Sequence, residues 1–191
     1  MIDILGMSGS LRAASCNTAL LHAASDLATP KQRVSRWSDL AAVPPFNEDH
    51  EHEPDAAVVA LRRAVQRCDA LLIATPEYNT TLPGQLKNAL DWLSRPDDDN
   101  ALSSKPVSVI GASQSPYGAQ WSQQAVRQVL SACGAELVDA ALHVPHCDTA
   151  FTADYQLRGD AQRRALVDTL TDLTNAARSA ASNAPSSADV S

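Results

Sequence analysis

Short apolar runs alternate with longer segments of helical periodicity along most of the chain. The clearest run is Ala-Leu-Leu-Ile-Ala-Thr over 70–75. Such a run indicates a strand that is buried on both faces, as in a parallel sheet covered by helices. Shorter runs of the same kind predict four further strands, over 2–6, 33–37, 107–111 and 140–144.

Helical segments separate these runs. Asp55 is positioned to cap a helix whose apolar residues recur on one face, and Thr152 is predicted to cap a terminal helix. Strands that alternate with helices predict a doubly wound α/β fold. Five strands in 191 residues favour a flavodoxin-like three-layer sandwich, with a parallel sheet of order 2-1-3-4-5, over the larger dinucleotide-binding fold. We expect one domain over residues 1–179 and a flexible tail, rich in Ala and Ser, over 180–191.

Charge and cysteine content narrow the range of functions. The formal net charge is −7, which argues against nucleic-acid binding and against anionic membranes, because both need a clustered cationic surface. No run approaches the roughly 18 apolar residues of a membrane helix. The four cysteines lie far apart and form no C-x-x-C pair, so we expect neither a disulfide framework nor a zinc site, and a cytoplasmic location.

Three polar loops follow predicted strands that are central in the order 2-1-3-4-5. They cover residues 8–17, 76–84 and 111–118. In such sheets ligands bind beyond the carboxyl ends of the strands, where the strand order reverses. The three loops therefore predict one ligand site.

The loop over 8–17 has the chemistry of an anion site. It offers hydroxyl groups, the guanidinium of Arg12 and the N-terminus of the following helix. It matches neither the dinucleotide fingerprint nor the P-loop motif, so a terminal monophosphate fits better than a pyrophosphate or a nucleoside triphosphate. The alternative is an ordinary strand-to-helix turn in which Ser15 or Asn17 merely caps the helix.

The loop over 76–84 is bounded by Pro76 and Pro83. A turn fixed by two prolines can present backbone groups to the edge of a flat heterocycle, and Tyr78 can pack against its face. A tight turn with a half-buried Tyr78 is the alternative.

Sequence motifs in the same loops resemble a known family. The first loop contains Gly-Ser-Leu-Arg over 9–12, and the second contains Pro-Glu-Tyr-Asn over 76–79, which leads into Pro-Gly-Gln-Leu-Lys-Asn-Ala-Leu-Asp-Trp-Leu-Ser-Arg-Pro over 83–96. With the third loop, these segments resemble the NADPH-dependent FMN reductases and their quinone-, azo- and chromate-reducing relatives, over residues 1–145. Ala13 and Ala14 depart from the pattern, because relatives often have a basic or polar residue and then glycine there.

The resemblance implies a function and a set of cofactor-binding residues. The expected activity is NAD(P)H-dependent transfer of two electrons, through bound FMN, to quinones, free flavin, azo compounds or metal oxyanions. No catalytic side chain is expected, because FMN carries the chemistry. A homodimer or homotetramer is also implied. The phosphate would be held by Ser10, Arg12, Ser15 and Asn17, with Thr18 beside them, and the ring would be lined by Pro76, Glu77, Tyr78, Asn79 and Ser113.

Other functions remain as alternatives. A flavodoxin-type electron carrier without its own NAD(P)H turnover shares the fold, although such carriers typically hold the phosphate without a charged side chain. An iron-sulfur flavoprotein would need a compact cysteine cluster, and a non-flavin interaction module would be colourless. The histidines His50 and His52 sit in an acidic loop without a second ligand cluster, so we expect no metal site.

Overall fold

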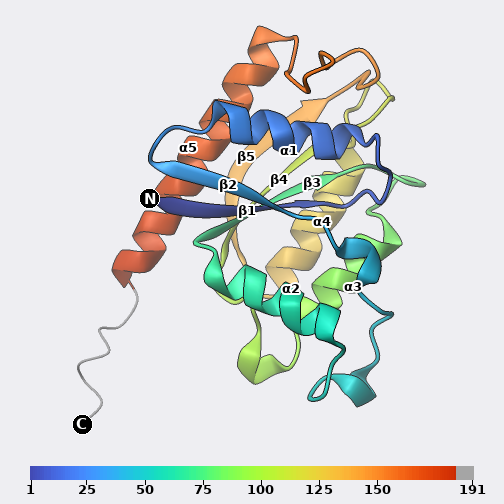
Figure 1. The fold of residues 1–191 in the computed structure, drawn as a ribbon, viewed down its shortest axis with the longest axis vertical. Coiled ribbons are helices and arrows are strands. Elements are labelled where there is room, and N and C mark those ends of the chain that lie inside the picture. Colours follow the sequence, from blue (N-terminus) through green and yellow to red (C-terminus); the bar gives the residue numbers. More distant parts are fainter. Residues whose placement is uncertain (184–191) are drawn as a thin grey trace.

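The computed structural model describes residues 1–183, which form a five-stranded parallel sheet between two layers of helices (Figure 1). The strands occur in the order β2-β1-β3-β4-β5, and every neighbouring pair is parallel. This confirms the predicted flavodoxin-like sheet. The strands are β1 (Ile2–Ser8), β2 (Gln32–Trp37), β3 (Ala70–Thr75), β4 (Pro106–Ala112) and β5 (Glu136–Val144).

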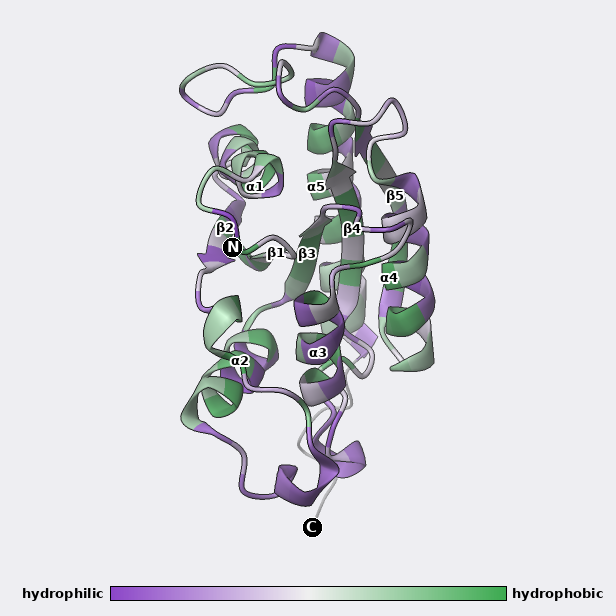
Figure 2. Cartoon of the chain, turned by 90° about the vertical axis from the view of Figure 1, so that its right-hand side faces the viewer, coloured by the Kyte–Doolittle hydropathy of each residue, from purple (hydrophilic) through white to green (hydrophobic). Residues whose placement is uncertain are grey.

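Five α-helices of the described chain cover the sheet. Helices α1 and α5 pack on one face, and α2, α3 and α4 pack on the other (Figures 1 and 2). Their bounds are α1 (Cys16–Leu27), α2 (Ala56–Arg67), α3 (Gly84–Leu93), α4 (Gln120–Ala132) and α5 (Asp160–Asn183).

The core consists of two apolar clusters, one on each face of the sheet. Alternate residues of β3 point to opposite faces, so that Leu71 and Ile73 join the cluster with α2 and α3, whereas Leu72 joins the cluster with α1 and α5. All residues of β3 are buried, as the apolar run over 70–75 predicts.

Helix ends follow the local sequence signals in most cases. The Asp55 carboxylate accepts the Ala57 amide at the start of α2, which confirms the predicted cap. Gly134 follows α4 with φ of 78°, the left-handed conformation that favours glycine after a helix.

The C-terminal region differs from the prediction. Helix α5 begins at Asp160, and the Thr152 hydroxyl accepts the amide of Gln156 inside the preceding loop. Thr152 is therefore not the helix cap, because a bridge between Phe151 and Leu157 turns the chain back first. Helix α5 also continues through residues 180–183, and the rest of the expected tail, 184–191, lies outside the described residues.

Candidate functional site

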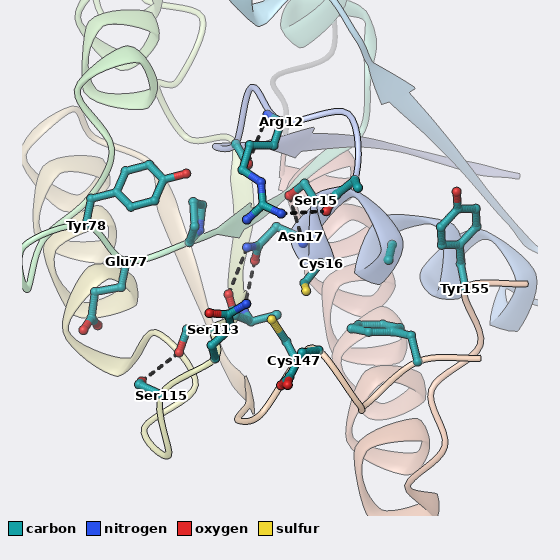
Figure 3. Close-up of a pocket in the computed structure, with 18 of the residues that line it drawn as sticks. Arg12, Ser15, Cys16, Asn17, Glu77, Tyr78, Ser113, Ser115, Cys147 and Tyr155 are labelled. Atoms are coloured by element: carbon teal, nitrogen blue, oxygen red, sulfur yellow. Dashed lines mark hydrogen bonds between the residues drawn. The ribbon is translucent and has the colours of Figure 1, made fainter. Parts of the chain in front are cut away.

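The three predicted loops meet around a cavity of about 570 Å³ at the carboxyl ends of the strands (Figure 3). A cavity of this size falls within the range of small-molecule and cofactor sites, roughly 300–1,000 Å³. Its walls come from the loops after β1, β3 and β4, and also from the loop after β5.

The β1–α1 loop supplies the anion-binding chemistry of the cavity. Ser15 caps α1, because its hydroxyl oxygen accepts the amides of Asn17 and Thr18. The amides of Ala14 and Cys16 donate to no acceptor within residues 1–183. The Arg12 guanidinium donates to the Ala14 carbonyl 3.4 Å away and forms no ion pair in that range. Free amides, a helix N-terminus and an unpaired cation thus face the same space.

Asn17 joins this loop to the end of β4. Its side-chain Nδ2 donates to the carbonyl of Ala112 at 3.0 Å, and its Oδ1 accepts the Ala112 amide at 2.9 Å. Asn17 is only 2% exposed. Its amide therefore mainly positions α1 against β4, and one N–H of Nδ2 is left for a ligand in the cavity.

The β3–α3 loop is fixed by its own backbone and by a helix. Tyr78 and Thr81 exchange two backbone hydrogen bonds of 3.1 Å, and Asn79 and Thr80 between them have positive φ. The Glu77 carboxylate accepts the amides of Trp121 and Ser122, so it caps α4. Tyr78 is 47% exposed, and its side chain borders the cavity (Figure 3).

Hydrogen bonds of two serine hydroxyl groups hold the β4–α4 loop in its conformation. The Ser113 hydroxyl lies 2.8 Å from that of Ser115 and accepts the amide of Ala119. Gly118 in the same loop has φ of 58° and packs against the backbone of β5. Ser113 thus lines the cavity and also holds the loop together.

The loop after β5 forms a wall that the sequence reasoning missed. Cys147, Asp148 and Phe151 line the cavity, and the Tyr155 ring stacks on that of His22 in α1 with centroids 4.9 Å apart. A polar segment directly after the last strand is a signal that was present in the sequence.

Two thiols meet inside this wall. Cys16 and Cys147 point toward one another from α1 and from the β5–α5 loop (Figure 3). Burial, followed by the contact with Cys16, raises the pKa of Cys147 to about 12, although Arg12 opposes the rise. Cys147 is therefore held as a neutral thiol.

Most of the predicted cofactor-binding residues line the cavity: Ser10, Arg12, Ser15, Asn17, Pro76, Glu77, Tyr78 and Ser113. Two others do not. The Thr18 hydroxyl donates to that of Ser8 and faces a second cavity, and Asn79 is exposed on the β3–α3 turn.

The donor set of the cavity fits FMN. The free amides at the start of α1 and the Arg12 guanidinium suit a phosphate, and the wide opening under Tyr78 suits a planar ring. No group of three or more His, Cys, Asp or Glu side chains in residues 1–183 is arranged to hold a metal ion. In the same part of the chain, no helix has the length and apolar character needed to cross a membrane.

The fold and the site together place the protein in the class of flavodoxin-like flavoenzymes. The chain belongs to the NADPH-dependent FMN reductase family, whose model matches residues 2–149. It is 42% identical over 130 residues to the NAD(P)H-dependent FMN reductase PA1204 of Pseudomonas aeruginosa, a match that covers 68% of this chain and 69% of that protein. It is 32% identical over 166 residues to the 2-hydroxy-1,4-benzoquinone reductase of a Burkholderia species, with 86% and 90% covered.

A solved structure supports the same assignment. The flavoenzyme FerB of Paracoccus denitrificans, an NAD(P)H:(acceptor) oxidoreductase, superposes with a TM-score of 0.86 at 27% identity. The match covers 94% of this chain and 98% of FerB. The chain is thus an NAD(P)H-dependent FMN oxidoreductase by family, as the motifs predicted.

Proposed function

We propose that the cavity at the ends of β1, β3 and β4 binds FMN, and that the protein uses it to reduce quinones with electrons from NAD(P)H. The observation that carries this proposal is the set of donors without protein partners at the start of α1, in the same cavity as the exposed ring of Tyr78. The acceptor class is inferred from relatives named for their reduction of quinones.

In this proposal each loop has its own task. Ser10, Arg12 and Ser15 bind the phosphate, with Asn17 and Thr18 holding α1 in place. The backbone of 76–79 and Ser113 border the ring, and Tyr78 packs beside it. FMN supplies the two-electron redox chemistry when bound.

No side chain is assigned as a nucleophile or general acid. Overall, NAD(P)H, a proton and a quinone give NAD(P)⁺ and a hydroquinone, and the second proton of the hydroquinone derives from the nicotinamide hydride with its electrons. The contribution of the chain is to hold the two reactants in turn on one face of the cofactor, where proximity and fixed N–H dipoles favour transfer.

Assembly and location belong to the same proposal. We propose a homodimer or homotetramer, because Tyr78, Tyr117 and Trp121 are exposed aromatic side chains beside the cavity, of the kind that interfaces bury. Light scattering after gel filtration tests it, and a monomer at working concentration contradicts it. A cytoplasmic location is consistent with four free cysteines among residues 1–183.

The test of the function has two stages. The purified protein should be yellow or take up FMN, and the flavin released by acid should be FMN. Mixing it with NADPH and menadione should then consume NADPH continuously. A flavin-loaded protein that leaves NADPH unchanged would instead be an electron carrier, and a protein that takes up no flavin would refute the cofactor assignment.

A further inference from the structure

A second cavity, of about 380 Å³, lies on the other side of the β1–α1 loop, against the carboxyl end of β2. Arg36 and Trp37 reach it from β2, and Leu11 and Arg12 reach it from the loop. Its remaining walls are Ser8, Ser10, Ala13, Thr18, Leu21, Ser38, Leu40 and Ala41.

The charge of this second cavity is opposite to that of the whole protein. The chain carries a net charge of −7, yet the lining contains two guanidinium groups and no carboxylate. Arg36 forms no ion pair with any residue in 1–183, so its guanidinium stays available for a ligand when Arg12 binds the FMN phosphate. By contrast, the comparable cavity beside α2 is lined by Asp97, Asp98 and Asp99. The cavity at β2 therefore favours an anion.

The same cavity also has apolar walls that a bare inorganic anion would not need. Leu11 is 56% exposed at its rim, Trp37 is partly buried, and Leu21 and Leu40 are buried beneath. A few polar groups set in apolar walls are typical of sites for organic ligands. The combination suits a phosphate attached to an aromatic base.

The two cavities share part of their walls. Ser10 and Arg12 line both, so the second cavity lies across the β1–α1 loop from the proposed FMN phosphate, and a dinucleotide whose nicotinamide lies over the flavin can extend past this loop into it. Arg36 also lies close to α1, because its charge helps to lower the pKa of His22, after burial. Arg36 lines the second cavity but not the first, so it can contact only the far end of such a ligand.

We propose that the second cavity binds the 2′-phosphorylated adenosine end of NADPH, with Arg36 as the main contact to the 2′-phosphate. The proposal rests on the proposed function, since it places the other end of the dinucleotide beside FMN. A guanidinium suits a phosphate monoester, because it can donate two parallel N–H bonds to the phosphate oxygens. The protein should therefore prefer NADPH to NADH.

The test compares two fragments that differ in the 2′-phosphate alone. Adenosine 2′,5′-bisphosphate and adenosine 5′-monophosphate are each titrated by calorimetry into the FMN-loaded protein. The bisphosphate should bind at least about tenfold more tightly, the size of one charge-assisted contact at a partly exposed site. Arg36→Gln should bring the two affinities to within about threefold of each other.

A matched variant controls for net charge. Arg63 is exposed on α2, lines neither cavity, and forms no ion pair with residues 1–183, so Arg63→Gln should keep the full difference. In steady state, Arg36→Gln should lower the ratio of kcat/KM for NADPH to that for NADH about tenfold, with kcat nearly unchanged.

Three results would overturn the proposal: equal affinities in the unmodified protein, no binding of either fragment, or an undiminished difference in Arg36→Gln. Each can occur in a protein that still binds FMN and reduces menadione. Loss of the proposed function, by contrast, would appear as failure to take up FMN or to turn over with either nucleotide. The two failures are therefore distinguishable.

Discussion

Asn17 and Ala112 are joined by two hydrogen bonds, of 3.0 and 2.9 Å, that connect the first turn of α1 to the last residue of β4. The two residues are 95 positions apart in the chain. One side-chain amide thus satisfies both backbone groups of a buried residue and fixes the loop proposed to bind the phosphate relative to the loop proposed to border the ring.

Removing this amide should destabilise the protein. Asn17→Ala leaves the buried amide and carbonyl of Ala112 without partners, so we expect the free energy of unfolding to fall by about 2–4 kcal/mol. Asn17→Asp should also destabilise, because it places an oxygen against the Ala112 carbonyl. Urea unfolding measures both effects, with the exposed Asn183→Ala as the control. A loss as small as that of the control would contradict the positioning role.

Arg12 should contribute to FMN affinity without being indispensable. Its guanidinium is exposed, so solvent screens the contact, and Arg12→Ala should weaken FMN binding by about 1–2 kcal/mol, or roughly fivefold to thirtyfold. Titration of the apoprotein, followed by quenching of flavin fluorescence, measures the Kd. Arg63→Ala serves as the control, and equal Kd values for the two variants would refute the phosphate assignment.

Gly118 should tolerate no side chain. Its φ is 58°, and a Cβ there would lie 2.8 Å from the Val144 nitrogen and 2.9 Å from the His143 carbonyl carbon. These are backbone atoms of β5, so Gly118→Ala should cost about 2–3 kcal/mol of stability.

Gly84 provides the matched substitution for this test. No atom lies within 4 Å of a Cβ built there, and Gly84 is the first residue of α3. Gly84→Ala should leave stability unchanged or raise it by about 0.5 kcal/mol. Thermal unfolding of both variants would contradict the argument if the two melted alike.

Stability should fall on the alkaline side because of buried thiols. Burial raises the pKa of Cys68 and Cys133, and that of Cys147 reaches about 12 from an ordinary value of 9.0. Above the ordinary value the unfolded chain loses these protons while the folded chain keeps them, so the free energy of unfolding decreases as pH rises.

This pH dependence can be assigned to one residue. Between about pH 9 and pH 11, Cys147→Ser should show a shallower fall in the midpoint of urea unfolding than the unmodified protein, because serine does not ionise there. Parallel curves for the two proteins would show that Cys147 ionises with an ordinary pKa. The same raised pKa predicts slow alkylation of Cys147 at neutral pH.

Local sequence signals were sufficient to predict the strands and the three loops that surround the site. The apolar run over 70–75 and its shorter counterparts predicted the strands, and the strand order then brought the loops after β1, β3 and β4 together. The hydrogen-bond partners of individual polar side chains could not be predicted in the same way. The Glu77 carboxylate caps a helix that begins 43 positions later, at Gln120, and nothing near Glu77 in the sequence indicates this.

The part of the cavity wall that follows β5 also could not be predicted from local sequence signals. Tyr155 reaches the cavity because its ring stacks on His22, a residue of α1. Thr152, which has the right chemistry for a helix cap, is engaged by a turn that Phe151 and Leu157 close. Both outcomes depend on contacts that form only after the chain has folded.

The sequence by itself determined the strands, their order and the loops that meet at the cavity, because apolar periodicity and turn residues act over a few neighbouring positions. The tertiary structure decided which donors remain free for a ligand. Asn17 is largely engaged by the backbone of Ala112, 95 positions away, and Ser113 by its own loop, whereas Arg12 and Arg36 are left without an ion pair among residues 1–183. A polar side chain bonds to whichever partner the fold brings near it, and that partner has no fixed distance along the chain.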